Sequence, residues 1–198
     1  MNIVFDLGGV VVDWQPDALI AASFADPEAR ARVRREVLDH PDWLALDRGT
    51  LSRPAAIRRA AQRTGIASDR VAAFFAAIPA ALTPMPASVA LLQRVHATGQ
   101  PLYCLSNMHV ASIEHLEANH DFFALFTGRI VSCRVATIKP EAAIYRHLLD
   151  DYALTATDSV FIDDVEVNLA AAAQFGMQTI RFTDAPQCAA ALRVLGCL

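Results

Sequence analysis

The sequence has almost no lysine. It contains sixteen arginines but a single lysine, Lys139, among its 198 residues. Such a bias reflects genome composition, through which most basic surface positions have become arginine. A lysine that persists suggests a place where a compact ammonium on a flexible stem cannot be replaced by a planar guanidinium. Chance can also leave one lysine anywhere, so Lys139 is a pointer that needs support from other residues.

Other absences exclude whole classes of protein. The formal net charge is −4, whereas a general nucleic-acid binder carries a basic face. Asp6 interrupts the N-terminal apolar run too early for an export signal. The longest later apolar stretch, residues 71–82, is too short to span a bilayer and contains Pro79. We therefore expect a soluble, cytoplasmic monomer or homodimer with no nucleic-acid or membrane partner.

Cysteines are few, and their spacing shows no CxxC pair. The four are Cys104, Cys133, Cys188 and Cys197. In a chain without an export signal, scattered cysteines are expected as reduced thiols in or near the core.

The chain begins with a short apolar run that ends in a carboxylate. Residues 3–5 lead into Asp6, and the glycines Gly8 and Gly9 and the β-branched run 10–12 follow. An apolar run bounded by glycines predicts a buried strand of a parallel sheet. The carboxyl end of such a strand is where open α/β sheets bind ligands. Taken alone, Asp6 is equally well interpreted as the residue that ends the strand.

Residues 15–84 predict an all-helical insertion after this strand. Helical patterns cover 16–25, 27–39, 52–63 and 68–78, and two prolines in the sequence TPMP at 83–86 mark a boundary. We therefore expect a core domain made of residues 1–14 and 85–198, with a helical cap domain at 15–84.

From residue 86 onward, strand and helix patterns alternate. Strands are expected at 101–107, 129–134, 160–162 and 178–182, and helices at 87–98, 109–119, from Pro140 onward, 165–175 and 186–195. Alternation of this kind predicts right-handed crossovers and a doubly wound parallel sheet with helices on both faces. The expected fold class is therefore α/β.

Polar residues follow the ends of several predicted strands. Parallel strands place these residues on one edge of the sheet: Asp6, Ser106 with Asn107, Lys139, and Asp163 with Asp164. Each has a simple structural interpretation alone, since serines and aspartates commonly cap helices and lysines commonly lie on the surface. Three carboxylates on one edge, however, repel one another unless a cation lies among them.

The group also fits a definite chemistry. Oxygen ligands suit a hard cation, and Mg²⁺ takes carboxylates together with waters and a substrate phosphate. A lysine and a serine hydroxyl supply donors for phosphate oxygens. A carboxylate in line with that phosphate can attack it and form an aspartyl-phosphate.

The chain resembles the haloacid dehalogenase superfamily. The resemblance rests on four motifs, which stand in family order and with family-like spacing: VFDLGGVVVDW, LSN, IKP and FIDDVEVN. It is closest to subfamily I, whose helical cap follows the first strand, and to members resembling glucose-1-phosphate phosphatases. The resemblance implies a Rossmann-like core, an inserted helical cap and a small phosphorylated substrate.

The resemblance also implies roles for individual residues. Asp6 is expected as the nucleophile, Ser106 with Asn107 as the phosphoryl-binding pair, and Lys139 as the group that neutralises nucleophile and phosphate. The expected Mg²⁺ ligands are Asp6, the backbone carbonyl of Gly8, Asp164 directly, and Asp163 directly or through water.

One position departs from the phosphatase pattern. Phosphatases of the superfamily carry a second aspartate two residues after the nucleophile, which acts as general acid and then base, and here that residue is Gly8. A general acid contributes about 10²–10⁴-fold to the rate. Asp13 and the cap are candidate sources of a substitute. His109, next to the LSN motif, is more simply a structural histidine at the start of a helix.

The resulting prediction is a Mg²⁺-dependent phosphatase of small phosphomonoesters, such as sugar phosphates. One alternative is a 2-haloacid dehalogenase, which needs neither a metal nor the second aspartate. The other is a non-catalytic protein that binds a phosphorylated ligand, against which the retained Asp6 and Lys139 argue.

Overall fold

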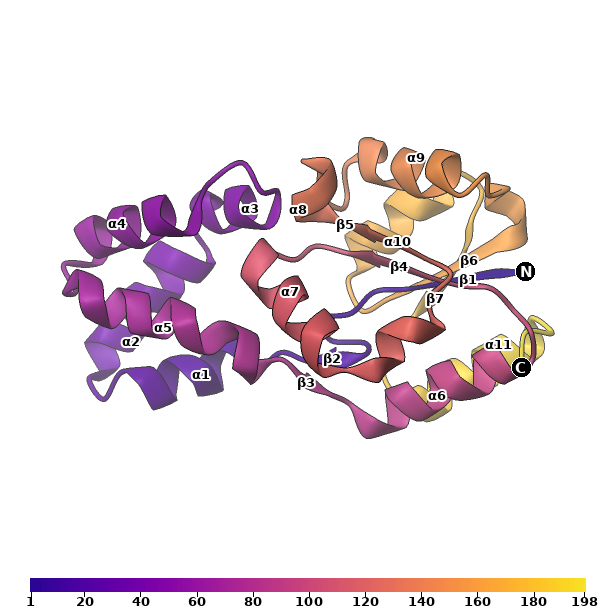
Figure 1. The fold of residues 1–198 in the computed structure, drawn as a ribbon, viewed down its shortest axis with the longest axis horizontal. Helices are drawn as coiled ribbons and strands as arrows, with labels where there is room; N and C mark the ends of the chain where they lie inside the picture. Colours follow the sequence, from indigo (N-terminus) through magenta and orange to yellow (C-terminus); the bar gives the residue numbers. More distant parts are fainter.

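The computed structural model describes residues 1–198 and shows two parts side by side (Figure 1). The larger part is a parallel sheet with helices on both faces, and it contains both chain termini. The smaller part consists of the helices between residues 16 and 81, called the helical unit below. No helix of the structure is long and apolar enough to cross a bilayer.

A five-stranded parallel sheet with the order β5-β4-β1-β6-β7 lies at the centre of the larger part. Its strands are Asn2–Phe5 (β1), Leu102–Ser106 (β4), Gly128–Val131 (β5), Ser159–Asp163 (β6) and Gln178–Arg181 (β7). The chain starts in the middle strand, builds one side of the sheet and then crosses to the other. This order creates a switch point between β1 and β6, and ligands of open α/β sheets bind at the carboxyl ends of the strands at such a point.

The strand side chains alternate between two apolar layers. In β1, Ile3 and Phe5 enter one layer and Val4 enters the other. Helices α6, α7 and α11 contribute to the first layer, and α9 and α10 cover the second (Figure 1). These helices are Pro86–Ala97 (α6), Val110–Asn119 (α7), Ala142–Asp151 (α9), Glu166–Ala173 (α10) and Ala185–Val194 (α11). Because both faces are covered, the central strands have continuous apolar sequences.

Short helical turns complete this part of the molecule. They are Asp121–Leu125 (η2), Ser132–Val135 (α8) and Ala156–Asp158 (η3). The strand predicted at 129–134 is therefore too long: β5 ends at Val131, and the chain turns into α8 at the fully buried Ser132.

The helical unit has a core of its own. Its helices are Pro16–Ser23 (α1), Pro27–Val33 (α2), the π-helix Arg34–Leu38 (η1), Pro41–Asp47 (α3), Arg53–Thr64 (α4) and Ser68–Ala81 (α5). Phe24 and Phe74 lie in this core with ring centroids 5.7 Å apart. The sequence did not predict α3, because its N-cap is an uncommon one: His40 Nδ1 accepts the backbone N–H of Asp42 at 3.1 Å.

A two-stranded ribbon joins the two parts. Strands Val12–Asp13 (β2) and Thr83–Pro84 (β3) pair antiparallel, with Val12 opposite Pro84. Both crossings of the chain between the parts run through this ribbon, which lies between them in Figure 1. The predicted limits of the insertion, 15 and 84, fall at its ends, whereas the division of the chain into two domains stays a prediction.

The α/β class and the doubly wound parallel sheet are confirmed by the strand order. The cysteines are also as expected, since all four are free thiols. Cys104, Cys188 and Cys197 are buried, and Cys133 is partly exposed.

The edge strand β5 gives a test of the packing. A Cβ built on Gly128 would lie 2.3 Å from the ring of Tyr152, whose hydroxyl accepts the backbone N–H of Arg129 at 2.8 Å. We expect Gly128→Ala to lower the free energy of unfolding by about 1–3 kcal/mol, because the ring has to leave this site. Urea denaturation measures the change.

Gly8→Ala is the matched control for this substitution. A Cβ at Gly8 would have no atom within 4 Å, so the same exchange there leaves stability nearly unchanged. Equal stability of the two variants would show that Tyr152 moves aside at no cost.

Candidate active site at the carboxyl edge of the sheet

Three carboxylates meet where β1 and β6 end. Asp6 follows β1, and its backbone N–H donates to the carbonyl of Ile162 at 2.9 Å, which fixes it beside the end of β6. Asp163 is the last residue of β6 and Asp164 follows it. One oxygen from each carboxylate lies within 4.8 Å of the others. The structure thus brings together the acidic residues that the sequence placed on one edge.

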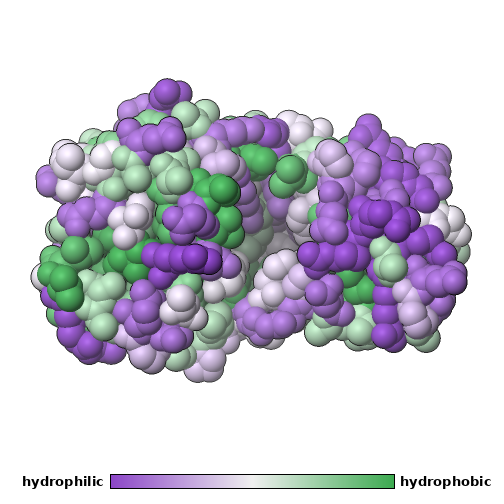
Figure 2. All heavy atoms as spheres, turned by 180° about the vertical axis from the view of Figure 1, so that it is seen from behind, coloured by the Kyte–Doolittle hydropathy of each residue, from purple (hydrophilic) through white to green (hydrophobic).

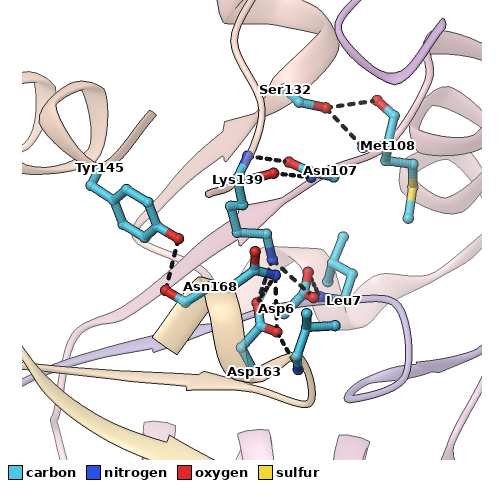
Figure 3. A network of polar contacts seen from close by, with 10 residues as sticks. Asp6, Leu7, Asn107, Met108, Ser132, Lys139, Tyr145, Asp163 and Asn168 are labelled. Carbon is cyan, nitrogen blue, oxygen red and sulfur yellow. Dashed lines mark hydrogen bonds and ion pairs between the residues drawn. The ribbon is translucent and has the colours of Figure 1, made fainter. Parts of the chain in front are cut away.

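The single lysine lies between two of these carboxylates, those of Asp6 and Asp163 (Figure 3). Lys139 Nζ is 2.9 Å from Asp6 Oδ2 and 2.7 Å from Asp163 Oδ2, and the residue is only 3% exposed. Its ammonium also lies over the ring of Phe161, 5.3 Å from the centroid. The prediction that this lysine belongs to the site is supported by its position.

Asn107 holds the backbone of Lys139 from the neighbouring strand end. The Asn107 side chain accepts the Lys139 N–H at 2.8 Å and donates to the Lys139 carbonyl at 3.0 Å. With its amide engaged on both sides, as Figure 3 shows, Asn107 positions the lysine. The sequence predicted Asn107 as a phosphoryl-binding residue, and that role stays a prediction.

Asp163 is the most completely hydrogen-bonded carboxylate of the three. Besides Lys139, it accepts the Val165 N–H at 2.8 Å and the Asn168 amide at 3.1 Å. Tyr145 donates its hydroxyl to the Asn168 carbonyl at 2.8 Å and so holds that residue in place. The sequence named Asn168 only as the last residue of the FIDDVEVN motif and did not name Tyr145, because only the fold shows that Asn168 binds Asp163 and that Tyr145 supports Asn168.

Asp164 approaches the glycine-rich turn after Asp6. A Cβ on Gly9 would lie 2.6 Å from Asp164 Oδ2, so only glycine allows this approach. Gly9 also has φ +75, a conformation that glycine adopts without strain. The second glycine of the first motif is therefore explained by the position of Asp164.

The charges around the cluster favour a bound cation. Burial raises the pKa of Asp6; the Lys139 ammonium opposes this rise and the Asp163 carboxylate adds to it. Burial alone would lower the pKa of Lys139, but Asp6 and Asp163 raise it above its usual value. One ammonium faces three carboxylates, and oxygen ligands in this number suit a hard divalent cation. The residues present fit Mg²⁺.

Ser106 provides a donor that the protein itself does not fully use. Its hydroxyl is buried at the end of β4 and has no well-formed hydrogen bond, although it lies close enough to Asp6 to contribute to lowering that pKa. A buried hydroxyl without a partner is costly unless a ligand completes its hydrogen bonding. This is the property expected of a residue that binds a phosphoryl oxygen.

A cavity of about 100 Å³ lies between the two parts of the molecule. The surface is hollowed between them in Figure 2. Gly8 and Asn107 border the cavity on the side of the sheet, and Trp43 and Asp47 of α3 border it on the side of the helical unit. Its full lining is Gly8, Trp14, Trp43, Asp47, Ile78, Leu82, Asn107, Met108, His109 and Ser112.

Asp47 is a buried carboxyl that the sequence did not single out. Its backbone carbonyl accepts the Ser132 hydroxyl at 2.6 Å, and Ser132 in turn accepts the Met108 N–H at 2.9 Å. Burial raises the pKa of Asp47 to about 7, and the backbone of His109 lowers it only partly. No motif marks this residue, because its burial arises from docking of α3 on the rest of the protein.

Asp13, a candidate replacement for the missing aspartate, and His109, interpreted from the sequence as structural, differ in position. Asp13 lies in the ribbon, accepts the Gln15 side chain at 3.0 Å and does not line the cavity. His109 does line it, with its ring 5.7 Å from that of Trp43 and Nε2 3.2 Å from the Ser112 hydroxyl. Burial lowers the pKa of His109 to about 4, so the ring is neutral at pH 7. His109 thus faces the cavity, and its structural role stays a prediction.

An ion pair links the helical unit to the loop that carries Lys139. Arg48 Nη1 and Nη2 bind the two carboxylate oxygens of Glu141 at 2.6 and 2.5 Å. Bidentate geometry of this kind adds orientation to attraction. It fixes α3, and with it Asp47, against the site.

Comparisons with known proteins agree on one family. The sequence profile of the haloacid dehalogenase-like hydrolases matches residues 1–176. A sesquiterpene phosphatase of Aspergillus oryzae is 24% identical over 195 residues, covering 98% of this chain and 96% of that protein.

Solved structures show the same fold. A haloacid dehalogenase family enzyme of Bacteroides thetaiotaomicron, in complex with magnesium and inorganic phosphate, has a TM-score of 0.70 at 18% identity, covering 92% of this chain and 93% of that one. An L-2-haloacid dehalogenase of Xanthobacter autotrophicus has a TM-score of 0.68 at 20% identity, covering 98% and 82%.

The raised pKa of Asp47 predicts a pH dependence of stability. The folded state keeps this proton up to about pH 7, whereas the unfolded chain releases it near pH 3.8. The folded state thus binds more protons between these values, and stability contributed by Asp47 falls as the pH rises through this window. Relative to Asp47→Asn, the wild-type free energy of unfolding should fall by about 2–3 kcal/mol between pH 5 and pH 8.

Urea denaturation at the two pH values measures this difference. Asp39→Asn, which removes an exposed carboxylate of the same unit, is the control and should follow the wild type. A constant difference between wild type and Asp47→Asn across the range would contradict the assignment.

Proposed function

Since the chain belongs to the haloacid dehalogenase-like hydrolases, we propose that it is a Mg²⁺-dependent phosphatase that hydrolyses small phosphomonoesters through an aspartyl-phosphate on Asp6. The observation that carries this proposal is the buried Asp6 carboxylate, paired with Lys139 and grouped with two further carboxylates at the switch point of the sheet.

Three side chains act in the first step, the transfer of the phosphoryl group from the ester to the protein. An Asp6 carboxylate oxygen attacks phosphorus, and the bond from phosphorus to the alcohol oxygen breaks. Lys139 and Ser106 donate to the phosphoryl oxygens as negative charge accumulates there. Water then attacks the phosphorus of the aspartyl-phosphate, which releases inorganic phosphate and restores the Asp6 carboxylate.

Asp6, Asp163, Asp164 and the Gly8 carbonyl would hold a magnesium ion, which would supply positive charge beside the attacking carboxylate and the phosphoryl group. Asp163 also forms an ion pair with the Lys139 ammonium. The complex of the Bacteroides enzyme with magnesium and phosphate supports this choice of ion.

In this proposal residues 15–84, which include the helical unit, act as a cap domain over the site. The alcohol part of the substrate occupies the cavity between the unit and the sheet. Its walls are largely apolar, with two tryptophans whose rings are stacked 6.2 Å apart. Together with the name of the Aspergillus oryzae relative, a sesquiterpene phosphatase, this lining favours an apolar alcohol over the sugar that the sequence suggested.

A 2-haloacid dehalogenase is the second candidate. It is favoured by the glycine at position 8 and by the likeness in fold to the Xanthobacter dehalogenase. The clustering of Asp163 and Asp164 beside Asp6 argues for the phosphatase, because displacement of halide requires no group of metal-binding carboxylates.

Phosphate release from a panel of phosphomonoesters tests the proposal. We expect turnover of at least one ester with Mg²⁺, loss of turnover in EDTA and recovery when Mg²⁺ is restored. Asp6→Asn should abolish turnover while the far-UV circular dichroism stays that of the wild type. Release of halide from 2-chloropropionate in EDTA, without phosphate release from any ester, would instead establish the dehalogenase.

Lys139→Arg tests the reason for the single lysine. We expect kcat to fall by about 10²–10³-fold, because a planar guanidinium cannot take the position of the ammonium between Asp6 and Asp163. The reverse exchange at an exposed site, Arg193→Lys, is the control and should leave kcat unchanged. A fall of less than threefold in Lys139→Arg would show that the lysine is retained by chance.

A further inference from the structure

The site lacks a proton donor in the segment after β1 that carries the proposed nucleophile, Asp6. Gly8 stands where the superfamily's second aspartate would stand, and a Cβ there would have no atom within 4 Å. The space is therefore open and continuous with the cavity that Gly8 borders. A leaving alcohol in that cavity needs a proton from a group on another wall.

Only two residues that line the cavity titrate between pH 3 and pH 9: Asp47 and His109. Both lie on the walls contributed by α3 and by the start of α7. His109 is neutral at pH 7, so it carries no imidazolium proton to give as an acid, and its Nε2 is engaged with Ser112. Asp47 has no cationic partner, since neighbouring Arg48 is engaged by Glu141.

We propose that Asp47, supplied by the helical unit, is the general acid that protonates the leaving alcohol and the general base of the second step. This assignment rests on the phosphatase function proposed above. It follows from the position of Asp47 across the cavity from Gly8 and from the contacts that fix its backbone. Burial keeps the carboxyl partly protonated at neutral pH, as its pKa of about 7 requires.

The proton balance of the reaction is complete with this one group. As Asp6 attacks phosphorus, the neutral Asp47 carboxyl gives its proton to the ester oxygen, and the alcohol leaves as ROH. The Asp47 carboxylate then takes a proton from the water that attacks the aspartyl-phosphate. Inorganic phosphate leaves, Asp6 is again a carboxylate and Asp47 is again protonated.

The test compares two leaving groups in one variant. In Asp47→Asn the side chain keeps its size and can still accept from the His109 backbone, but it has no acidic proton. For hexyl phosphate, whose alkoxide is a poor leaving group, we expect kcat/KM to fall by about 10²–10⁴-fold. For 4-nitrophenyl phosphate, whose phenolate leaves without a proton, we expect a fall of less than about threefold.

Two further variants complete the experiment. Asp47→Glu should recover part of the activity on hexyl phosphate, because it restores a carboxyl, and Asp39→Asn should match the wild type on both esters. Equal losses on both esters would show that Asp47 only docks α3, and no loss on either would show that it has no role. In both cases the proposed phosphatase function would still stand, because the wild-type protein releases phosphate. If the wild-type protein released no phosphate, both the phosphatase function and this assignment would be wrong.

Discussion

The Lys139 ammonium between Asp6 and Asp163 is the interaction on which the site depends. Buried charges lose their hydration, and mutual attraction compensates for that only with good geometry and further hydrogen bonds. Here the Asn168 amide and the Val165 N–H satisfy the remaining demand of Asp163. The ammonium in turn needs β1, β6 and the loop before α9 in fixed positions, so the fold and the site are specified by the same contacts.

Much of this arrangement follows from the sequence. The continuous apolar runs identify the central strands, because both faces of the sheet are covered, and strand ends in a parallel sheet share one edge. The sequence therefore predicts that Asp6, Ser106, Lys139 and the aspartate pair lie together on one edge. The four motifs also indicate the family that the profile match shows.

What the sequence could not give arises from contacts between distant segments. Helix α3 starts with a histidine cap, which has no strong propensity signal, and Asp47 at its end becomes buried only when the helix docks on Ser132. Tyr145 and Asn168 lie 23 residues apart and meet only because α9 and α10 cover the same face. Such residues stand out only through their contacts with residues that are distant in the sequence, and local sequence patterns do not contain those contacts.

The ribbon of β2 and β3 bears on when Asp47 can lie close to Asp6. The chain joins the helical unit to the rest of the protein only through this ribbon, so a rotation about the ribbon displaces most the side of the unit that lies opposite to it. Helix α3 lies on that side, next to α8 (Figure 1). If the proposed phosphatase opens about this ribbon to exchange substrate and product, Asp47 moves away from Asp6, and the proposed general acid is absent from the site until the two parts close again.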